Sequence, residues 1–252
     1  MEPSGYDFYQ ASRNELMDKY MAKPRALIVG VGSGVSASLA RALKAQGYKI
    51  ILAARNIEKI ASLIAETKAE AHVCDIVKAE DVAALFDAIE GRLEVVIANP
   101  AQRVRGPLVE VDPAEVKASL EVTAFGSFLV GQAAAKRMLE QEAQDGKRGT
   151  ILFTGASAGV KGFPQSATFA MGKFAQRGLA QSMARELHPQ GVHVAWVNID
   201  GAIKSATREE PADKPASMLD PDEIAKNYIH LINQQRSVWT DELVVRPWVE
   251  KF

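Results

Sequence analysis

From residue 25 onward, short apolar segments alternate with longer amphipathic ones, and this alternation constrains the fold more than any other feature. Because the apolar segments are uninterrupted, they predict strands that are covered on both faces of a sheet. Strands that are joined through helices by right-handed crossovers run parallel. Strands are expected at residues 26–29, 49–53, 70–74, 94–98, 150–154, 193–198 and 243–245, and helices at 35–46, 57–66, 79–89, 113–140, 165–187 and 221–234. The sequence therefore predicts an α/β fold, a doubly wound three-layer sandwich with a central seven-stranded parallel sheet.

The length and charge of the chain narrow its class. A chain of 252 residues can bury one large core, so residues 23–252 are expected to form a single domain. The formal net charge of -1 gives no electrostatic reason to expect nucleic acid or an anionic membrane as a partner. The single cysteine, Cys74, excludes an internal disulfide framework and fits a reducing compartment. No apolar run approaches the ~20 residues of a membrane-spanning helix, and the N-terminus lacks the features of a signal peptide, so a cytoplasmic protein is expected.

Residues 1–22 differ from the rest of the chain, since they hold three of its five tyrosines. Met21 begins a segment that would itself be a plausible start for the domain, which favours a weakly ordered tail from an upstream start. The alternative is a short helix, with Leu16, Met17 and Tyr20 at helical spacing, that packs on the body or on a neighbouring subunit.

The one long irregular segment lies between residues 202 and 219, before the last predicted helix, and contains Pro211, Pro215 and several charges. Loops of this length inside compact domains are usually lids or disordered excursions. We expect a lid over the site.

A glycine-rich turn follows the first predicted strand and opens the first helix. Glycines in this place let the backbone approach a pyrophosphate and direct amide groups and the helix dipole toward it. The usual G-x-G-x-x-G spacing is not met; the glycines fit G-x-x-x-G with Ser36 in place of a final glycine. The turn predicts a dinucleotide site at Gly30, Gly32, Ser33, Gly34 and Val35.

Several further segments, taken together with this turn, resemble the short-chain dehydrogenase/reductase family from about residue 26 to the end. The resemblance implies a Rossmann-like sandwich, a nicotinamide cofactor and a small-molecule substrate. The matching segments are Cys74-Asp75, Ala98-Asn99-Pro100-Ala101, Gly126-Ser127-Phe128, the long helix with Lys173, the stretch from Gly178 to Leu187, and Gly191-Val192-His193-Val194.

The resemblance also implies particular cofactor contacts. Asp75 would hydrogen-bond the adenine ring, and Asn99 with its neighbours would line the adenosine-ribose side. Further contacts are implied for Ile76, Pro100, Lys173, Gly201 and Ile203.

The end of the second predicted strand bears on the choice between NAD(H) and NADP(H). The chain carries no acid there to accept a hydrogen bond from a ribose 2'-hydroxyl, and Arg55 follows at the next residue. Since a guanidinium suits a 2'-phosphate, NADP(H) is expected over NAD(H). The alternative is that Arg55 is an ordinary solvated residue at a helix start.

The catalytic pattern of the family is only partly present. The resemblance implies a Tyr with a Lys four residues on, a Ser on the preceding strand end and an Asn on the long helix. Lys173 matches, whereas the Tyr, Ser and Asn positions are Phe169, Ala156 and Thr123. Phenylalanine has no ionisable proton, so the usual general acid is missing, and we infer a natural divergent branch.

Other groups near the expected nicotinamide could replace this acid. Asp200, at the end of the sixth predicted strand, could donate a proton if its pKa is raised, or it could only cap the following turn. The remaining polar candidates are Thr154, Ser157, Thr168 and the pair Arg103 and Arg105. No metal site is expected.

Two functions are consistent with the sequence. The first is an atypical NADP(H)-dependent oxidoreductase that acts on a carbonyl or a conjugated C=C bond. In this case water or a non-tyrosine acid protonates the substrate. The second is a catalytically silent NADP(H)-binding protein, used as a sensor or scaffold. The resemblance further implies a homotetramer or homodimer built on the two long helices and the last strand, which the apolar faces of those helices also fit.

Overall fold

The computed structural model describes residues 23–205 and 207–250. The predicted N-terminal extension, residues 1–22, and the last aromatic residue, Phe252, lie outside the described residues.

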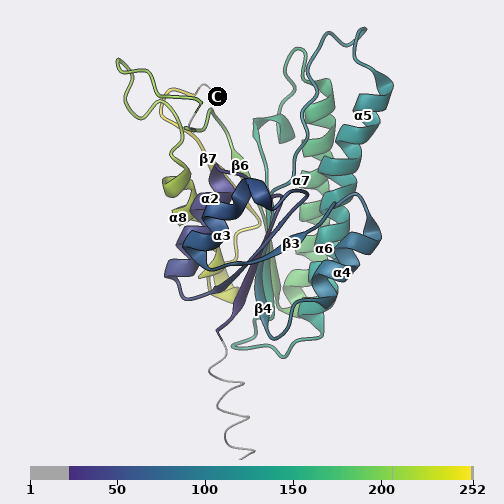
Figure 1. The fold of residues 1–252 in the computed structure, drawn as a ribbon, viewed down its shortest axis with the longest axis vertical. Helices are drawn as coiled ribbons and strands as arrows, with labels where there is room; N and C mark the ends of the chain where they lie inside the picture. Colours follow the sequence, from purple (N-terminus) through teal and green to yellow (C-terminus); the bar gives the residue numbers. More distant parts are fainter. Residues whose placement is uncertain (1–22, 206, 251–252) are drawn as a thin grey trace, which may run out of the picture.

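One parallel sheet organises the described chain, in the strand order β3-β2-β1-β4-β5-β6-β7 (Figure 1). This confirms the predicted seven-stranded parallel sheet, and the strand boundaries differ from the expected ones by a few residues at most. The strands are β1 (Arg25–Val29), β2 (Lys49–Ala54), β3 (Glu70–Val73), β4 (Leu93–Ala98), β5 (Gly149–Thr154), β6 (Val192–Ile199) and β7 (Glu242–Val245).

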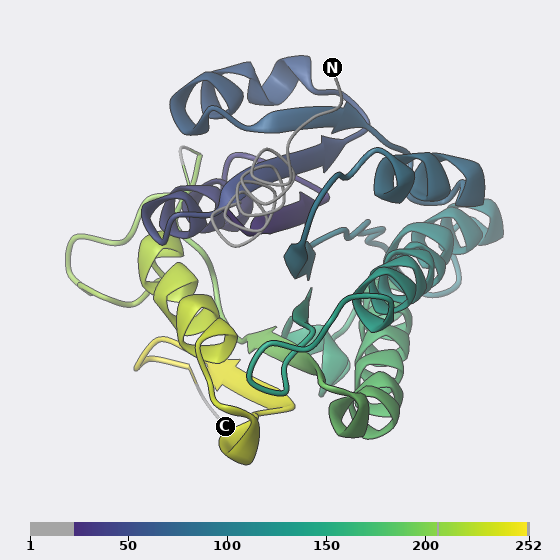
Figure 2. The ribbon, with the colours of Figure 1, turned by 90° about the horizontal axis from the view of Figure 1, so that it is seen from below.

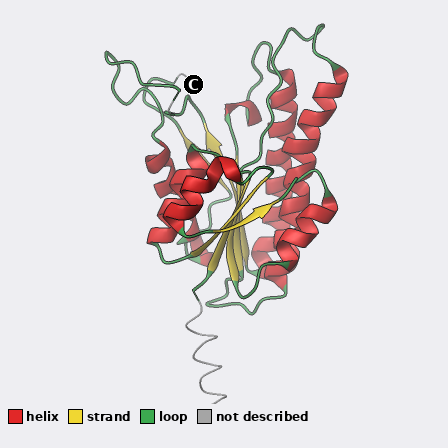
Figure 3. Ribbon diagram, in the orientation of Figure 1, coloured by secondary structure: helices red, strands yellow, loops and turns green. Residues whose placement is uncertain are grey.

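Helices cover both faces of the sheet, which makes the three layers of the predicted sandwich (Figures 2 and 3). One layer contains α2 (Val35–Ala45), α3 (Ala61–Thr67) and α8 (Pro221–Ile232). The other contains α4 (Ala79–Asp87), α5 (Pro113–Leu120), α6 (Gly126–Leu139) and α7 (Ala167–Leu187).

The central strands are mostly apolar because each of their two faces packs into a separate core. In β1, Leu27 and Val29 belong to the core that includes residues of α4, α6 and α7. Ala26 and Ile28 belong to the core shared with α2 and α8. Successive side chains of a strand point to opposite faces, so an uninterrupted apolar strand is what a doubly covered sheet requires.

The predicted helix over residues 113–140 is present, and it contains a π-helical turn that the sequence pattern did not indicate. A π-helical turn, Glu121–Phe125, separates α5 from α6. Within it, Thr123 is fully buried and its Oγ1 accepts a hydrogen bond, at 3.1 Å, from the backbone N–H of Gln102 in the segment after β4. The widened turn therefore coincides with a tertiary contact that apolar periodicity does not encode.

Two other helices start later than predicted. Gln165 has a φ of 57°, which a right-handed helix cannot include, so α7 begins at Ala167 after the N-cap residue Ser166. The helix expected from residue 57 opens with a 3-10 turn, Glu58–Ile60, before α3.

Strand β1 lies between β2 and β4. The strands β2 and β3 are added on one side of β1 and the strands β4 to β7 on its other side, so the strand order reverses at β1. Crevices at such a point, at the carboxyl ends of the strands, are where open α/β sheets hold ligands. The segment between residues 202 and 219 rises beyond the same edge, and its two ends are held together where the Leu219 N–H donates to the Ala202 carbonyl.

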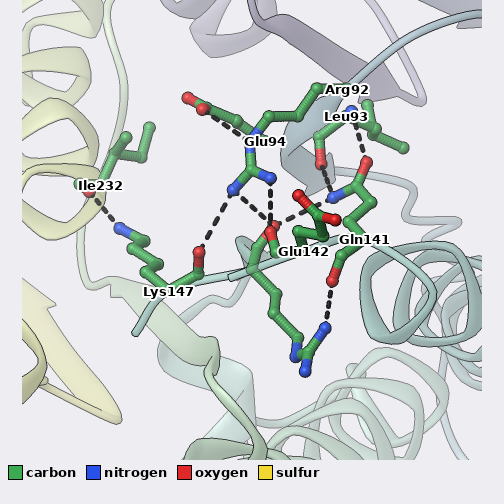
Figure 4. A network of polar contacts seen from close by, with 8 residues as sticks. Arg92, Leu93, Glu94, Gln141, Glu142, Lys147 and Ile232 are labelled. Carbon is green, nitrogen blue, oxygen red and sulfur yellow. Dashed lines mark hydrogen bonds and ion pairs between the residues drawn. The ribbon is translucent and has the colours of Figure 1, made fainter. Parts of the chain in front are cut away.

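The opposite edge of the sheet is closed by a polar network that includes Arg92 and Gln141 (Figure 4). The Arg92 guanidinium donates to the Glu142 carbonyl at 2.8 Å. The Gln141 side chain bonds both the N–H and the carbonyl of Leu93. Lys147 donates to the Ile232 carbonyl at 2.5 Å. These bonds satisfy backbone groups at strand and helix ends, so the network fastens the loop after α6 to the sheet.

Among the described residues, no helix combines the length and the apolar character that crossing a membrane would require.

Candidate active site

A cavity of about 550 Å³ opens at the carboxyl edge of the sheet. It extends from the glycine turn after β1 to the start of α7. Its described lining includes Gly30, Gly32, Gly34, Val35, Asn99, Arg103, Arg105, Thr154, Ala156, Ser157, Phe169, Lys173, Gly201, Ile203 and Arg208. The structure thus brings together cofactor and catalytic candidates that are far apart in the sequence.

Gly30 is required by the shape of the turn. Its φ is 79°, and a Cβ at this position would lie 2.8 Å from the backbone nitrogen of Pro100. Any side chain would therefore meet both backbone strain and a backbone clash. The close approach joins the end of β1 to the end of β4.

The rest of the turn forms an open cradle at the N-terminus of α2. A Cβ on Gly32 or Gly34 would meet nothing within 4 Å. Within the described chain, the backbone N–H groups of residues 32–36 have no hydrogen-bond acceptor, and α2 has no acidic residue in its first turn. Free amide donors, the helix dipole and open space above two glycines fit the pyrophosphate of a dinucleotide.

A short polar chain holds this cradle against β4. The Asn99 amide donates to Ser36 Oγ at 2.6 Å, and Ser36 Oγ donates to the Gly30 carbonyl at 3.4 Å. Ser36 is almost fully buried. The residue that replaces the last glycine of the motif thus contributes a hydrogen bond to the shape of the turn, a role that the motif spacing did not indicate.

A second hollow of about 200 Å³ adjoins the first, since both are lined by Gly30, Asn99 and Ala101. It lies between the ends of β2, β3 and β4. Residues predicted to contact adenosine line it: Arg55, Asp75, Ile76, Asn99 and Pro100. Arg55 is exposed here and Ala54 precedes it, so the described lining places a guanidinium, and no carboxylate, at the end of β2.

Lys173 is buried at the other end of the large cavity, with only 3% of its surface exposed. Its Nζ donates to the Thr154 carbonyl at 2.6 Å and to Gln176 Oε1 at 3.1 Å. Burial, together with the nearby charge of Arg103, lowers the pKa of Lys173 to about 7. Gln176 in turn donates to Ser127 Oγ, and Ser127 Oγ donates to the Thr123 carbonyl, so a buried chain links the ammonium to the π-helical turn.

Phe169 and Ala156 both line the cavity near Lys173. The guanidinium carbon of Arg103 lies 4.2 Å from the centre of the Phe169 ring, in a cation-π arrangement. Ser157 also lines the cavity and supplies a hydroxyl, whereas Phe169 and Ala156 supply none.

Thr123 is not among the described lining residues of either hollow, and its hydroxyl accepts a hydrogen bond from the Gln102 N–H. Ser119 Oγ donates to the Gln102 carbonyl at 2.9 Å, so α5 and the π-helical turn hold Gln102 by both of its backbone groups. The effect is to anchor the segment that carries Arg103.

Asp200 follows β6 as predicted but is not among the described lining residues of the large cavity. It is 3% exposed, and its Oδ2 lies 3.6 Å from Nη2 of Arg246. The neighbouring residues Gly201 and Ile203 do line the cavity. The geometry gives one carboxylate oxygen of Asp200 an ion pair, and its role as an acid stays a prediction.

Sequence reasoning missed Gln176 and Arg208. Gln176 lies three residues after Lys173 on α7, and that spacing could have indicated a partner for the lysine. Arg208 comes from the irregular segment 202–219, where no periodicity predicts which side chain faces inward. The described residues contain no group of three or more His, Cys, Asp or Glu side chains that could hold a metal ion.

The doubly wound sheet and a cavity that holds both the glycine cradle and Lys173 define a dinucleotide-binding α/β protein. The family model "short chain dehydrogenase" matches residues 24–215. The chain belongs to this family and is an oxidoreductase of the short-chain type.

Individual relatives agree with this assignment over most of their length. An uncharacterized oxidoreductase of Staphylococcus aureus is 27% identical over 231 residues, which cover 88% of this chain and 96% of the relative. The crystal structure of a short-chain dehydrogenase from Rhodopseudomonas palustris is 31% identical with a TM-score of 0.75, covering 89% of this chain and 99% of that one. A metagenomic short-chain oxidoreductase in complex with NADP is 28% identical with a TM-score of 0.75, and the match covers 90% of this chain and 98% of that one.

Proposed function

We propose that the protein is an NADP(H)-dependent oxidoreductase with a non-standard active site, which acts on a carbonyl or a conjugated C=C bond of a small molecule. The observation that carries the proposal is the arrangement of the large cavity. It runs from the glycine cradle to a buried Lys173, beside Phe169 and Ala156. A cofactor that binds the cradle would direct its nicotinamide toward these residues.

Arg55 supports NADP(H) over NAD(H). It lines the hollow between the ends of β2 and β4, where the adenosine ribose is expected, and Ala54 offers no carboxylate for a 2'-hydroxyl. A guanidinium can form paired, charge-assisted hydrogen bonds with a 2'-phosphate. The related metagenomic oxidoreductase with bound NADP is consistent with this choice.

When bound, the nicotinamide cofactor supplies or accepts a hydride. The protein must then position the substrate and provide for a proton. Phe169 and Ala156 can position a substrate by shape alone, since neither carries a hydroxyl. Lys173 can bind ribose hydroxyls, and its pKa of about 7 also suits proton exchange with water in the cavity. Protonation by water, or by an acid other than tyrosine, is therefore part of the proposal.

The test is to mix the purified protein with NADPH and a panel of ketones and enones, and to follow the absorbance of the cofactor. Oxidation above the rate without protein is expected for at least one compound class. Tight NADPH binding with no oxidation of any compound would contradict catalysis and favour the silent NADP(H)-binding protein.

A homodimer or homotetramer belongs to the same proposal. Large apolar side chains are exposed along the outer helices: Phe125 and Phe128 around the start of α6, and Met171 and Phe174 on α7. Each pair has i, i+3 spacing, which places its members on one helical face. Sedimentation equilibrium should give a dimer or tetramer mass, and Phe128→Glu with Phe174→Glu should shift it toward the monomer. A monomer at all concentrations of the unmodified protein would contradict an assembly.

A further inference from the structure

The substrate end of the large cavity is strongly basic. Arg103, Arg105 and Arg208 line it together with Lys173, and none of its described lining residues is Asp or Glu. The charge is local, because the whole chain has a formal net charge of only -1. Such a concentration of one sign in a cavity calls for a specific explanation.

The three arginines come from two separate segments that both line the cavity. Arg103 and Arg105 lie two residues apart in the irregular segment after β4, and Arg208 lies in the segment 202–219. The position of Arg103 is fixed from two sides. Its neighbour Gln102 is held by Thr123 and Ser119, and its guanidinium lies on the Phe169 ring.

No carboxylate of the described chain forms an ion pair with Arg103, Arg105 or Arg208. Glu210, close to Arg208 in sequence, instead pairs with Lys204 at 3.2 Å. The like charges also act on one another: partial burial, and then repulsion by Arg105 and Arg208, lower the pKa of Arg103. The cluster is thus an electrostatically unfavourable arrangement that a bound anion would relieve.

We propose that the substrate carries an oxyanion, a carboxylate or a phosphate monoester, which Arg103, Arg105 and Arg208 bind beside Phe169. This inference rests on the proposed function, since it names the substrate class of the same site. Arginine is suited to the task because its planar fork of donors matches both oxyanions. The anion would hold the reacting part of the substrate between Ala156 and Phe169.

The cofactor is the rival ligand for these arginines, because it also carries phosphates. The glycine cradle and Arg55 already provide a place for the pyrophosphate and for a 2'-phosphate, and Arg55 lines the adjoining hollow rather than the large cavity. Arg103 lies instead over Phe169, next to the buried Lys173. Variants can separate the two possibilities.

The experiment is calorimetric titration at constant ionic strength, with and without saturating NADPH. The probes are succinate against its neutral counterpart succinamide, and glycerol 2-phosphate against glycerol. At least one anion should bind ten-fold or more tightly than its neutral counterpart, and the preferred anion shows whether the oxyanion is a carboxylate or a phosphate. The affinity for the preferred anion should fall about ten-fold in each of the variants Arg103→Gln, Arg105→Gln and Arg208→Gln, since each removes charge-assisted hydrogen bonds.

Two controls complete the design. Arg185→Gln removes an exposed arginine of α7 that is not among the described cavity residues, so it should leave anion binding unchanged. Arg103→Lys keeps the charge but loses the fork, and should give an intermediate affinity, with folding of each variant checked by its melting temperature.

Equal binding of each anion and its neutral counterpart would overturn the proposal. So would arginine variants that weaken NADPH as much as the anion, because the cluster would then belong to the cofactor. Failure of the unmodified protein to bind NADPH would instead contradict the proposed function, while the titrations without cofactor would still test the anion site.

Discussion

The guanidinium of Arg103 lies over the ring of Phe169, with its central carbon 4.2 Å from the ring centre. The contact joins the two unusual features of the site: an aromatic ring without a hydroxyl and a cluster of cations at the cavity mouth. The sequence comparison predicts that Phe169 occupies the position of the family's tyrosine. Phenylalanine keeps the ring face that attracts a cation and gives up the acidic proton.

Restoring the hydroxyls should restore ordinary carbonyl reduction. We expect the double variant Phe169→Tyr with Ala156→Ser to raise the rate of NADPH-dependent ketone reduction by about 10²-fold, the lower end of the usual gain from a positioned general acid. The measurement is the initial rate with a ketone panel. Phe163→Tyr is the matched control, because Phe163 also lines the cavity but lies outside the motif. No gain in the double variant would argue against the alignment of these positions or against an intact substrate pocket.

Arg55 should determine cofactor preference. Arg55→Gln is expected to weaken NADPH binding by about ten-fold and to leave NADH binding unchanged, since only the 2'-phosphate loses charge-assisted hydrogen bonds. The two affinities are measured by titration with NADPH and with NADH, using the fluorescence of each cofactor as the signal. Lys59→Gln, which removes a nearby exposed charge, should have no such effect. An equal loss for both cofactors would show that Arg55 acts on something other than the 2'-phosphate.

Gly30 should be sensitive to substitution for two separable reasons. Gly30→Ala adds strain at a φ of 79° and a clash with the Pro100 backbone, and should lower the free energy of unfolding by more than about 2 kcal/mol. Gly47→Ala is the matched control: its φ is 92°, but an added Cβ meets nothing within 4 Å. The control should lose only about 1 to 2 kcal/mol in urea denaturation. Equal losses would mean that the contact with Pro100 contributes nothing.

Burial of Lys173 should make stability depend on pH. Because its pKa is lowered from 10.5 to about 7 in the folded protein, the unfolded chain binds more protons between these pH values. Its contribution to stability therefore rises with pH across this window. The unfolding free energy of the native protein, minus that of Lys173→Met, should increase by up to about 1.4 kcal/mol per pH unit. Denaturation series from pH 7 to 9.5 measure this difference, and a constant or falling value would contradict the lowered pKa.

Much of this fold was accessible from the sequence because its strongest signals are local. Uninterrupted apolar strands such as Ala26–Val29 imply a doubly covered sheet, and a glycine turn directly after such a strand implies a phosphate site. Both signals depend on a few adjacent residues. The family motifs then indicated which side chains would meet at the carboxyl edge of the sheet.

The parts that the sequence did not reveal depend on contacts between distant residues. The π-helical turn at Glu121–Phe125 accompanies a hydrogen bond from Gln102, which lies 21 residues away from Thr123. The ion pair between Asp200 and Arg246 cannot be inferred from their spacing in the sequence. Arg208 reaches the cavity from an irregular segment, whose path is set by tertiary contacts rather than by propensity.

We propose that this site transfers hydride from NADPH without a tyrosine. The most direct measurement uses NADPH deuterated at C4 of the nicotinamide, on either face, with ketones and enones that do or do not carry a carboxylate. Mass spectrometry of the products then shows where the label goes. We expect deuterium in at least one product formed by the unmodified protein. Hydride transfer without a tyrosine would be contradicted if the unmodified protein binds NADPH yet labels no compound, while the variant carrying Phe169→Tyr and Ala156→Ser does label one.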